Sequence, residues 1–272
     1  MKQRRWLDSR KGRFVCGLLI LAVIPGRARG EPRPEAIAAF NSTIQSIEVR
    51  LTKQHQTAAG FVVPLAQGAE AAERLHRGEL IVERVPPSSG QTLPGAMLHH
   101  WRGTAFAPGA RAAEFERLMR DFEAYPRTFS PQVLRATATA QSDNHIQAWM
   151  RVRQRHVITV VMDSSYDVTF GRLDAVHGYS LSRSTKMSEI SSAGTKEEHA
   201  LGGEEEHGFL WRQNTYWSYE ERDGGLYMQI ESVSLTRAIP AGLGWAVGPF
   251  VESVPRESLE FTLRSVCSAL HR

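Results

Sequence analysis

The sequence predicts an α+β fold in which one curved antiparallel sheet wraps around a long helix at the C-terminal end. Two observations carry this prediction. From residue 132 to residue 237 the chain reads almost entirely as strands, and apolar residues then recur at helical spacing up to residue 271. Consecutive strands without intervening helices favour an antiparallel sheet, and the closing helix is expected to cover one of its faces.

Before residue 132, helices and strands are mixed. Pro34 suits the first turn of an initial helix, and Pro108 breaks a strand before a further helix begins. Tyr125-Pro126 is expected to end that helix, because the residue before a proline disfavours helical geometry. The expected helices cover residues 34–56, 69–75 and 113–122, and the expected strands cover residues 80–85 and 97–107.

The later strands are separated by recognisable turns. Asp223-Gly224-Gly225 is a strong hairpin signal between the last two strands, and residues 187–206, rich in Ser, Gly and Glu, are expected to form a long surface loop. The apolar phase of the last strand shifts past Ser232, which suggests a β-bulge there. The expected strands cover residues 132–140, 145–155, 157–170, 176–186, 208–221 and 225–237.

The closing helix contains a proline. Because Pro255 lies inside the helical pattern, we expect a short helix followed by a main helix over residues 254–271. Its apolar stripe is expected to pack on the sheet. The stripe consists of Leu259, Leu263, Val266 and Leu270.

The first thirty residues have the three parts of an export signal. A basic stretch precedes an apolar run over residues 14–24, and the small residues Ala28 and Gly30 predict cleavage before Glu31. The run is shorter than the ~20 residues of a membrane-spanning helix. The sequence therefore predicts an exported protein, periplasmic or secreted. Its parts are an export signal (1–30), an N-terminal helical extension (31–75) and a main domain (76–272).

Removing the signal changes the charge of the chain. The whole sequence has 33 basic and 29 acidic residues, and the signal contains eight of the basic residues and one acidic residue. The remainder therefore has 25 basic and 28 acidic residues, a net charge of −3. The apparent basicity belongs to the signal, so it gives no support to a nucleic-acid partner. Only Cys267 remains after cleavage, which excludes an intramolecular disulfide or a cysteine metal cluster.

The order of elements resembles the START/polyketide-cyclase (SRPBCC) superfamily, whose architecture is called the helix-grip fold. The resemblance covers residues 97–271 and lies in a strand ending at Ala107-Pro108-Gly109-Ala110, in the helix exit Asp121-Phe122-Glu123-Ala124-Tyr125-Pro126, and in the hairpin strand that closes at Ile239-Pro240 before the terminal helix. It is similar to bacterial coenzyme-Q-binding START-like proteins. The N-terminal extension departs from the superfamily's plan.

The resemblance implies a cavity between the sheet and the C-terminal helix that binds a lipid, a quinone or a polyketide-like compound. Many members are carriers or binding proteins, and some are cyclases or hydrolases. A non-enzymatic binding protein, in transient contact with membranes, is the first hypothesis. The alternatives are a cyclase, dehydratase or hydrolase on the same fold, and an interaction module with a filled cavity whose N-terminal helix contacts a partner. The sequence specifies no oligomeric state.

The strand around residue 215 carries the first group of candidate ligand-binding residues. Period-2 alternation places four aromatic and two polar side chains on one face, a combination that suits a cavity wall or ordinary packing under the terminal helix. The candidates from this face are Trp211, Gln213, Trp217 and Tyr219.

The neighbouring strand carries the second group. Tyr227, Gln229 and Glu231 share a face. If these side chains face the cavity, burial would raise the pKa of Glu231, and Glu231 and Tyr227 become candidate catalytic residues. If they face outward, they are solvated. Trp245 and Phe250, beside Gly242 and Gly248, complete the candidates, either as a movable lid or as a rigid cover of the core.

Further motifs give little chemistry. The sequence has no nucleophile elbow and no phosphate-binding glycine loop, and His99 and His100 point to opposite faces of a strand. We therefore predict no metal and no cofactor. Trp149, Arg151, Arg153 and Arg155 share one strand face, which is either solvated or an anion-recognition patch.

Overall fold

The computed structural model describes residues 30–65, 68–86, 91–155, 159–202, 205–239 and 244–271. Within these ranges ten strands form one antiparallel sheet, in the order β1-β3-β10-β9-β7-β6-β5-β4, with β2 beside β3 and β8 beside β7. The strands are β1 (Ile81–Arg84), β2 (Gln91–Leu93), β3 (Ala96–Pro108), β4 (Val133–Gln141), β5 (His145–Arg155), β6 (Thr159–Arg172), β7 (His177–Ser191), β8 (His199–Ala200), β9 (Arg212–Arg222) and β10 (Gly225–Arg237).

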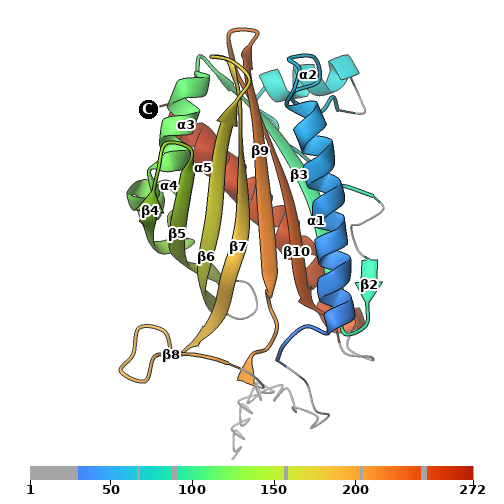
Figure 1. Ribbon diagram of the computed structural model, residues 1–272, viewed down its shortest axis with the longest axis vertical. Helices are drawn as coiled ribbons and strands as arrows, with labels where there is room; N and C mark the ends of the chain where they lie inside the picture. The colour runs from blue at the N-terminus through green and yellow to red at the C-terminus, as the bar shows by residue number, and fades with distance from the viewer. Residues whose placement is uncertain are drawn as a thin grey trace, which may run out of the picture.

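The long C-terminal helix α5 (Gly244–Leu270) crosses one face of this sheet, which we call the inner face (Figure 1). Leu259, Leu263 and Val266 are buried there, as the predicted stripe requires. Gly103 of β3 permits the close approach, because a Cβ atom at this position would lie 2.7 Å from a methyl group of Leu263. The predicted α+β helix-grip architecture is thus confirmed.

The N-terminal helix α1 (Pro34–Gln54) lies on the opposite face of the sheet, which we call the outer face (Figure 1). Its side chains Phe40, Ile47 and Leu51 are buried in a cluster with Val233 and Leu235 of β10. A second helix, the short α2 (Gly68–His76), follows on the same side. The sheet is therefore covered on both faces, by helices from the two ends of the chain.

Most element boundaries agree with the expectations. The short strands β2 and β8 were not expected, β9 begins at Arg212 instead of residue 208, and four further features differ. The predicted exit Tyr125-Pro126 is itself a short helix, α4 (Tyr125–Thr128), after α3 (Ala112–Arg120) and a 3₁₀ turn. Strand β7 extends into the predicted surface loop. Helix α5 runs through Pro255 as one element, so the expected division into two helices is wrong.

The fourth difference is the absence of the bulge expected at Ser232. Strand β10 pairs without a register shift with β3 from Gly225 to Arg237 and with β9 from Gly225 to Leu235, so its odd-numbered residues all face the outer side. The apparent phase shift has another cause: Val233 and Leu235 lie under α1, whereas Glu231 and Gln229 meet polar partners. The predicted hairpin is confirmed, with positive φ at Asp223 and Gly224, as a type I′ turn requires.

Residues 1–29 of the predicted export signal lie outside the described residues. Among the helices that are described, none is both long and apolar enough to span a membrane.

Candidate functional site

The inner face is divided into two regions along β9, and the first is a packed core. Trp217 and Tyr219 are buried, and their rings lie 5.2 and 4.7 Å, centroid to centroid, from that of Phe115 on α3. Tyr219 covers Gly178 of β7, where a side chain would collide with its ring. This region contributes stability and leaves little room for a ligand.

The second region begins one inner-face position further along the same strand. Ser182, Thr215 and Ser232 are partners in adjacent strand pairs, so they form a row of small hydroxyl side chains across β7, β9 and β10. We call these three residues the hydroxyl row. All three are partly exposed, unlike the aromatic residues beside them. The next inner-face residue, Gln213, is also partly exposed, and its amide lies 3.5 Å from Ser232.

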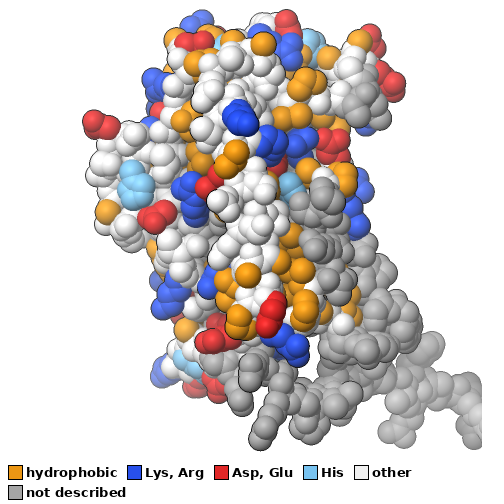
Figure 2. Space-filling view, turned by 45° about the vertical axis from the view of Figure 1, so that its right-hand side comes forward, with side chains coloured by type: hydrophobic (Ala, Val, Ile, Leu, Met, Phe, Trp, Pro, Cys, Tyr) orange, Lys and Arg blue, Asp and Glu red, His pale blue; other side chains and the backbone are white. Residues whose placement is uncertain are grey.

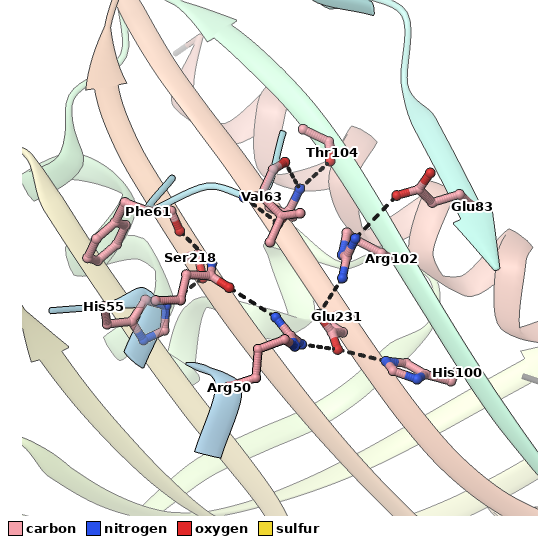
Figure 3. Close-up of polar contacts among 12 residues, drawn as sticks. Arg50, His55, Phe61, Val63, Glu83, His100, Arg102, Thr104, Ser218 and Glu231 are labelled. Atoms are coloured by element: carbon pink, nitrogen blue, oxygen red, sulfur yellow. Dashed lines mark hydrogen bonds and ion pairs between the residues drawn. The ribbon is translucent and has the colours of Figure 1, made fainter. Parts of the chain in front are cut away.

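The outer face contains a buried polar network centred on Glu231, which is only 3% exposed. Figure 3 shows Arg50 of α1 and His100 of β3 approaching this carboxylate from opposite sides. One carboxylate oxygen accepts hydrogen bonds from Arg50 (2.5 Å) and is 2.7 Å from His100 Nε2, and the other lies 3.3 Å from Arg102. Glu231 thus joins α1 to two strands.

The charges around Glu231 determine its protonation. Burial alone would raise the pKa of Glu231, but the hydrogen bond from His100 and the charges of Arg50 and Arg102 outweigh burial and lower the pKa to about 2. The carboxyl group is therefore ionised at neutral pH. This is the opposite of the raised pKa expected for an acid facing an apolar cavity.

Gln229 and Tyr227 continue the polar network along β10. The Gln229 amide exchanges two hydrogen bonds of 3.1 Å with the backbone of Val63, in the segment after α1, and donates a third to Thr104. The Tyr227 hydroxyl lies 2.6 Å from Nε2 of His76 on α2. Tyr227, Gln229 and Glu231 therefore each contact a different part of the N-terminal extension.

His55, just after α1, completes the interface. Its Nε2 lies 2.8 Å from the Ser218 hydroxyl, and its ring stacks on Tyr179 with the centroids 4.3 Å apart. Burial and, to a smaller degree, the charge of Arg50 lower the pKa of His55 to about 4. His55 is therefore neutral at physiological pH.

The predicted site residues do not form one site. Trp217 and Tyr219 lie in the inner core and Gln213 beside the hydroxyl row, whereas Tyr227, Gln229 and Glu231 face outward, where they are buried under the extension instead of solvated. Trp211 precedes β9, so strand alternation does not apply to it; it packs with α1 and donates from its indole N–H to the Gly30 carbonyl, at 2.8 Å. The side chains of Trp245 and Phe250 lie outside the described part of the structure.

Sequence reasoning missed Arg50, His100 and Arg102, the partners of Glu231. The only signal was indirect: an acidic residue in an otherwise buried strand needs a counter-charge, but nothing in the sequence selects which basic residue supplies it.

The basic face of β5 is partly neutralised by acidic neighbours. Arg151 forms ion pairs with Asp163 and Glu198, at 2.7 and 2.6 Å. Figure 2, turned so that the α1 side of the molecule comes forward, shows basic and acidic side chains intermixed on the surface that it presents.

Comparisons with known proteins give structural neighbours only. No protein-family model matches the chain, and neither does any curated protein. Among solved structures it is similar to a STAR-related lipid transfer protein from Xanthomonas axonopodis, with 15% identity, a TM-score of 0.45 and coverage of 67% of this chain and 97% of that one. It is also similar to the Zhui aromatase/cyclase from a Streptomyces species (11%, TM-score 0.43, coverage 64% and 94%) and to human STARD10 (9%, TM-score 0.42, coverage 75% and 80%).

The START resemblance seen in the sequence thus also appears among solved structures. At these identities and scores the likeness specifies no ligand, no reaction and no site residue for this chain. Function has to be argued from the chain's own side chains.

Proposed function

We propose that this protein is exported and that it binds a hydrophobic small molecule, such as a lipid, a quinone or a polyketide-like compound, between the inner face and α5. The observation that carries the proposal of ligand binding is the hydroxyl row. A sheet face that is covered by a helix is normally filled by large apolar side chains. Ser182, Thr215 and Ser232 are instead small, polar and partly exposed.

The position of the row supports this proposal. It lies between the aromatic core and the end of β10 at Arg237, and α5 begins seven residues later, at Gly244. Small side chains leave volume under a covering helix, and their hydroxyl groups can orient a polar head while the aromatic residues beside them supply apolar area. This combination suits a mostly apolar ligand with a few polar groups.

The proposal favours binding over catalysis. Glu231 and Tyr227, the candidate catalytic residues of the alternative enzyme hypothesis, lie on the outer face. They are held by Arg50 and His76 of the N-terminal extension. A ligand on the inner face would not contact either group, so neither is proposed as catalytic.

Binding can be tested with native mass spectrometry and organic extraction of the protein from its own host, followed by titration with an NBD-labelled fatty acid and a short-chain ubiquinone. We expect a retained or acquired apolar compound. Thr215→Phe, which fills the space above the row, should weaken probe binding by about tenfold or more. Thr57→Phe makes the same change at an exposed position and should leave binding unchanged.

Two outcomes would refute the binding proposal. One is that the wild-type protein neither retains nor takes up any apolar compound. The other is that a folded Thr215→Phe variant binds both probes as tightly as the wild type does. Ser182→Leu provides a second variant of the row if Thr215→Phe fails to fold.

Export is tested separately. Residues 1–40, fused to an alkaline phosphatase that lacks its own signal, should give enzyme activity outside the cytoplasm, and the N-terminus of the full-length mature protein should be Glu31. Retention of Met1 in the purified protein, or an inactive fusion, would contradict export and leave the binding proposal intact.

A further inference from the structure

A cleft lies at the far end of the sheet from the hydroxyl row. It lies between α3, the β4–β5 turn and the end of β6, and its volume is ≈ 640 Å³. Along β9, the buried Tyr219 and Trp217 separate this cleft from Thr215. The cleft is therefore distinct from the proposed ligand site.

The cleft volume of ≈ 640 Å³ falls inside the range of about 300–1,000 Å³ that is typical of small-molecule sites.

The floor of the cleft is built around the carboxylate of Glu116, which is only 5% exposed. Its two oxygens accept hydrogen bonds from Nε of Arg120 (2.8 Å) and Nε of Arg172 (2.6 Å), and the second oxygen also accepts one from the Tyr219 hydroxyl (3.0 Å). Burial by itself raises the pKa of Glu116, but the hydrogen bonds from Arg172, Arg120 and Tyr219 outweigh it and lower the pKa. The carboxylate is therefore a fixed negative charge that orients two guanidinium groups.

This arrangement leaves the outer ends of both guanidinium groups available. Arg120 uses Nη1 to bond the Asp143 carbonyl, and within the described ranges its Nη2 and both Nη atoms of Arg172 have no hydrogen-bond partner. The Arg120 guanidinium lies over the Phe170 ring, 4.1 Å from its centroid, which restrains it further. A third guanidinium, that of the exposed Arg117, also lines the cleft and pairs with none of the described side chains.

The charge of the cleft favours an anion. Three arginines line it against two acidic residues, Glu116 and Asp143, which leaves a net charge of +1. Because Glu116 holds Arg120 and Arg172 through their Nε atoms, the N–H groups that remain are pre-oriented donors, the geometry that guanidinium groups use to bind phosphate and carboxylate. We infer that this cleft binds the phosphate or carboxylate group of a small anionic molecule.

A purely structural role makes a different prediction. The ion pairs of Glu116 also tie α3 to β6, so loss of Arg172 would destabilise the protein whether or not an anion binds. Arg117 makes no such tie. A structural role therefore predicts that Arg117→Gln changes nothing, whereas anion binding predicts that it weakens the affinity.

The test is an NMR titration of the full mature protein, which follows the Nε–Hε signals of Arg120 and Arg172 at constant ionic strength. Inorganic phosphate and succinate serve as separate probes, so the two arms distinguish a phosphate ligand from a carboxylate ligand. We expect saturable shifts with at least one probe. Arg117→Gln and Arg172→Gln should each weaken binding by about tenfold, as expected for the loss of a charge-assisted hydrogen bond.

Arg127→Gln is the matched control, because Arg127 is an exposed arginine on α4 that does not line the cleft. It should leave the affinity for either probe unchanged. The inference is overturned if neither probe gives a saturable shift, or if Arg127→Gln weakens binding as much as Arg117→Gln does. Binding of the NBD-labelled fatty acid should be unaffected by Arg117→Gln, so this result is independent of the proposed function.

Discussion

The two faces of the sheet are each covered by a helix, but they are held to it by different interactions. On the inner face, α5 packs through apolar side chains, and Leu263 approaches the backbone at Gly103. On the outer face, α1 combines an apolar cluster with ion pairs. Glu48 bonds Arg183 at 2.6 Å, and Arg50 bonds Glu231 at 2.5 Å.

This difference separates packing from specificity. Apolar contacts are tolerant of position, so α5 can cover a face that is only partly filled and still be stable. Buried charges are costly unless they are paired, so the contacts of Glu231 fix the position of α1 on the sheet. The N-terminal extension is accordingly part of the domain's packing, and the inner face is where room for a ligand is expected.

The largest effect is expected from removing the outer cover. A chain that begins at residue 66 exposes Leu98, Tyr216, Val233 and Leu235, each at most 1% exposed in the full structure. At about 1.5–3 kcal/mol for each side chain, the loss is about 6–12 kcal/mol, comparable to the whole stability of a typical domain. We expect no soluble monomer by gel filtration, whereas a chain beginning at residue 31 should be monodisperse. Cooperative unfolding of the shorter chain at the same Tm would show that the two faces are independent.

The next effect tests the buried charge. Glu231→Gln leaves Arg50, His100 and Arg102 without their carboxylate and should lower the free energy of unfolding by about 3–5 kcal/mol in urea denaturation. Glu83→Gln is the matched control, since Glu83 also bonds Arg102 but is 35% exposed, and it should cost at most about 1 kcal/mol. Equal losses for the two variants would mean that burial of Glu231 is not what holds the network.

The inner face should respond to loss of volume. Leu263→Ala removes a fully buried side chain and should cost about 2–5 kcal/mol, with little dependence on pH because no charge is involved. Leu173→Ala, at a position that is 38% exposed, should change the stability by less than about 0.5 kcal/mol. If the cost of Leu263→Ala changed with pH, the contrast between the faces would fail.

The smallest effect is a dependence of stability on pH. The pKa of His55 is about 4 in the folded protein and 6.5 in the unfolded chain, so between these values the unfolded state binds a proton that the folded state does not. Stability should therefore fall as the pH decreases, by about 2 kcal/mol between pH values of about 7 and 5. His55→Gln should flatten this slope in thermal or urea unfolding. An unchanged slope would assign the pH dependence to another group.

Local sequence signals determined the elements themselves. Period-2 alternation located the strands, Asp223 and Gly224 marked the hairpin because both adopt positive φ, and helical spacing of Leu259, Leu263 and Val266 identified the face of α5 that packs on the sheet. These features depend on neighbours a few residues apart, which the sequence shows directly.

Only the tertiary structure decided which face each residue occupies and which residue it meets. Alternation separates Tyr227, Gln229 and Glu231 from their neighbours on β10, but it cannot name the inner side when helices cover both faces of a sheet. The contact between Glu231 and Arg50 joins positions 181 residues apart in the chain. It exists because α1 crosses the outer face, and no local propensity in a helix specifies the surface on which that helix docks.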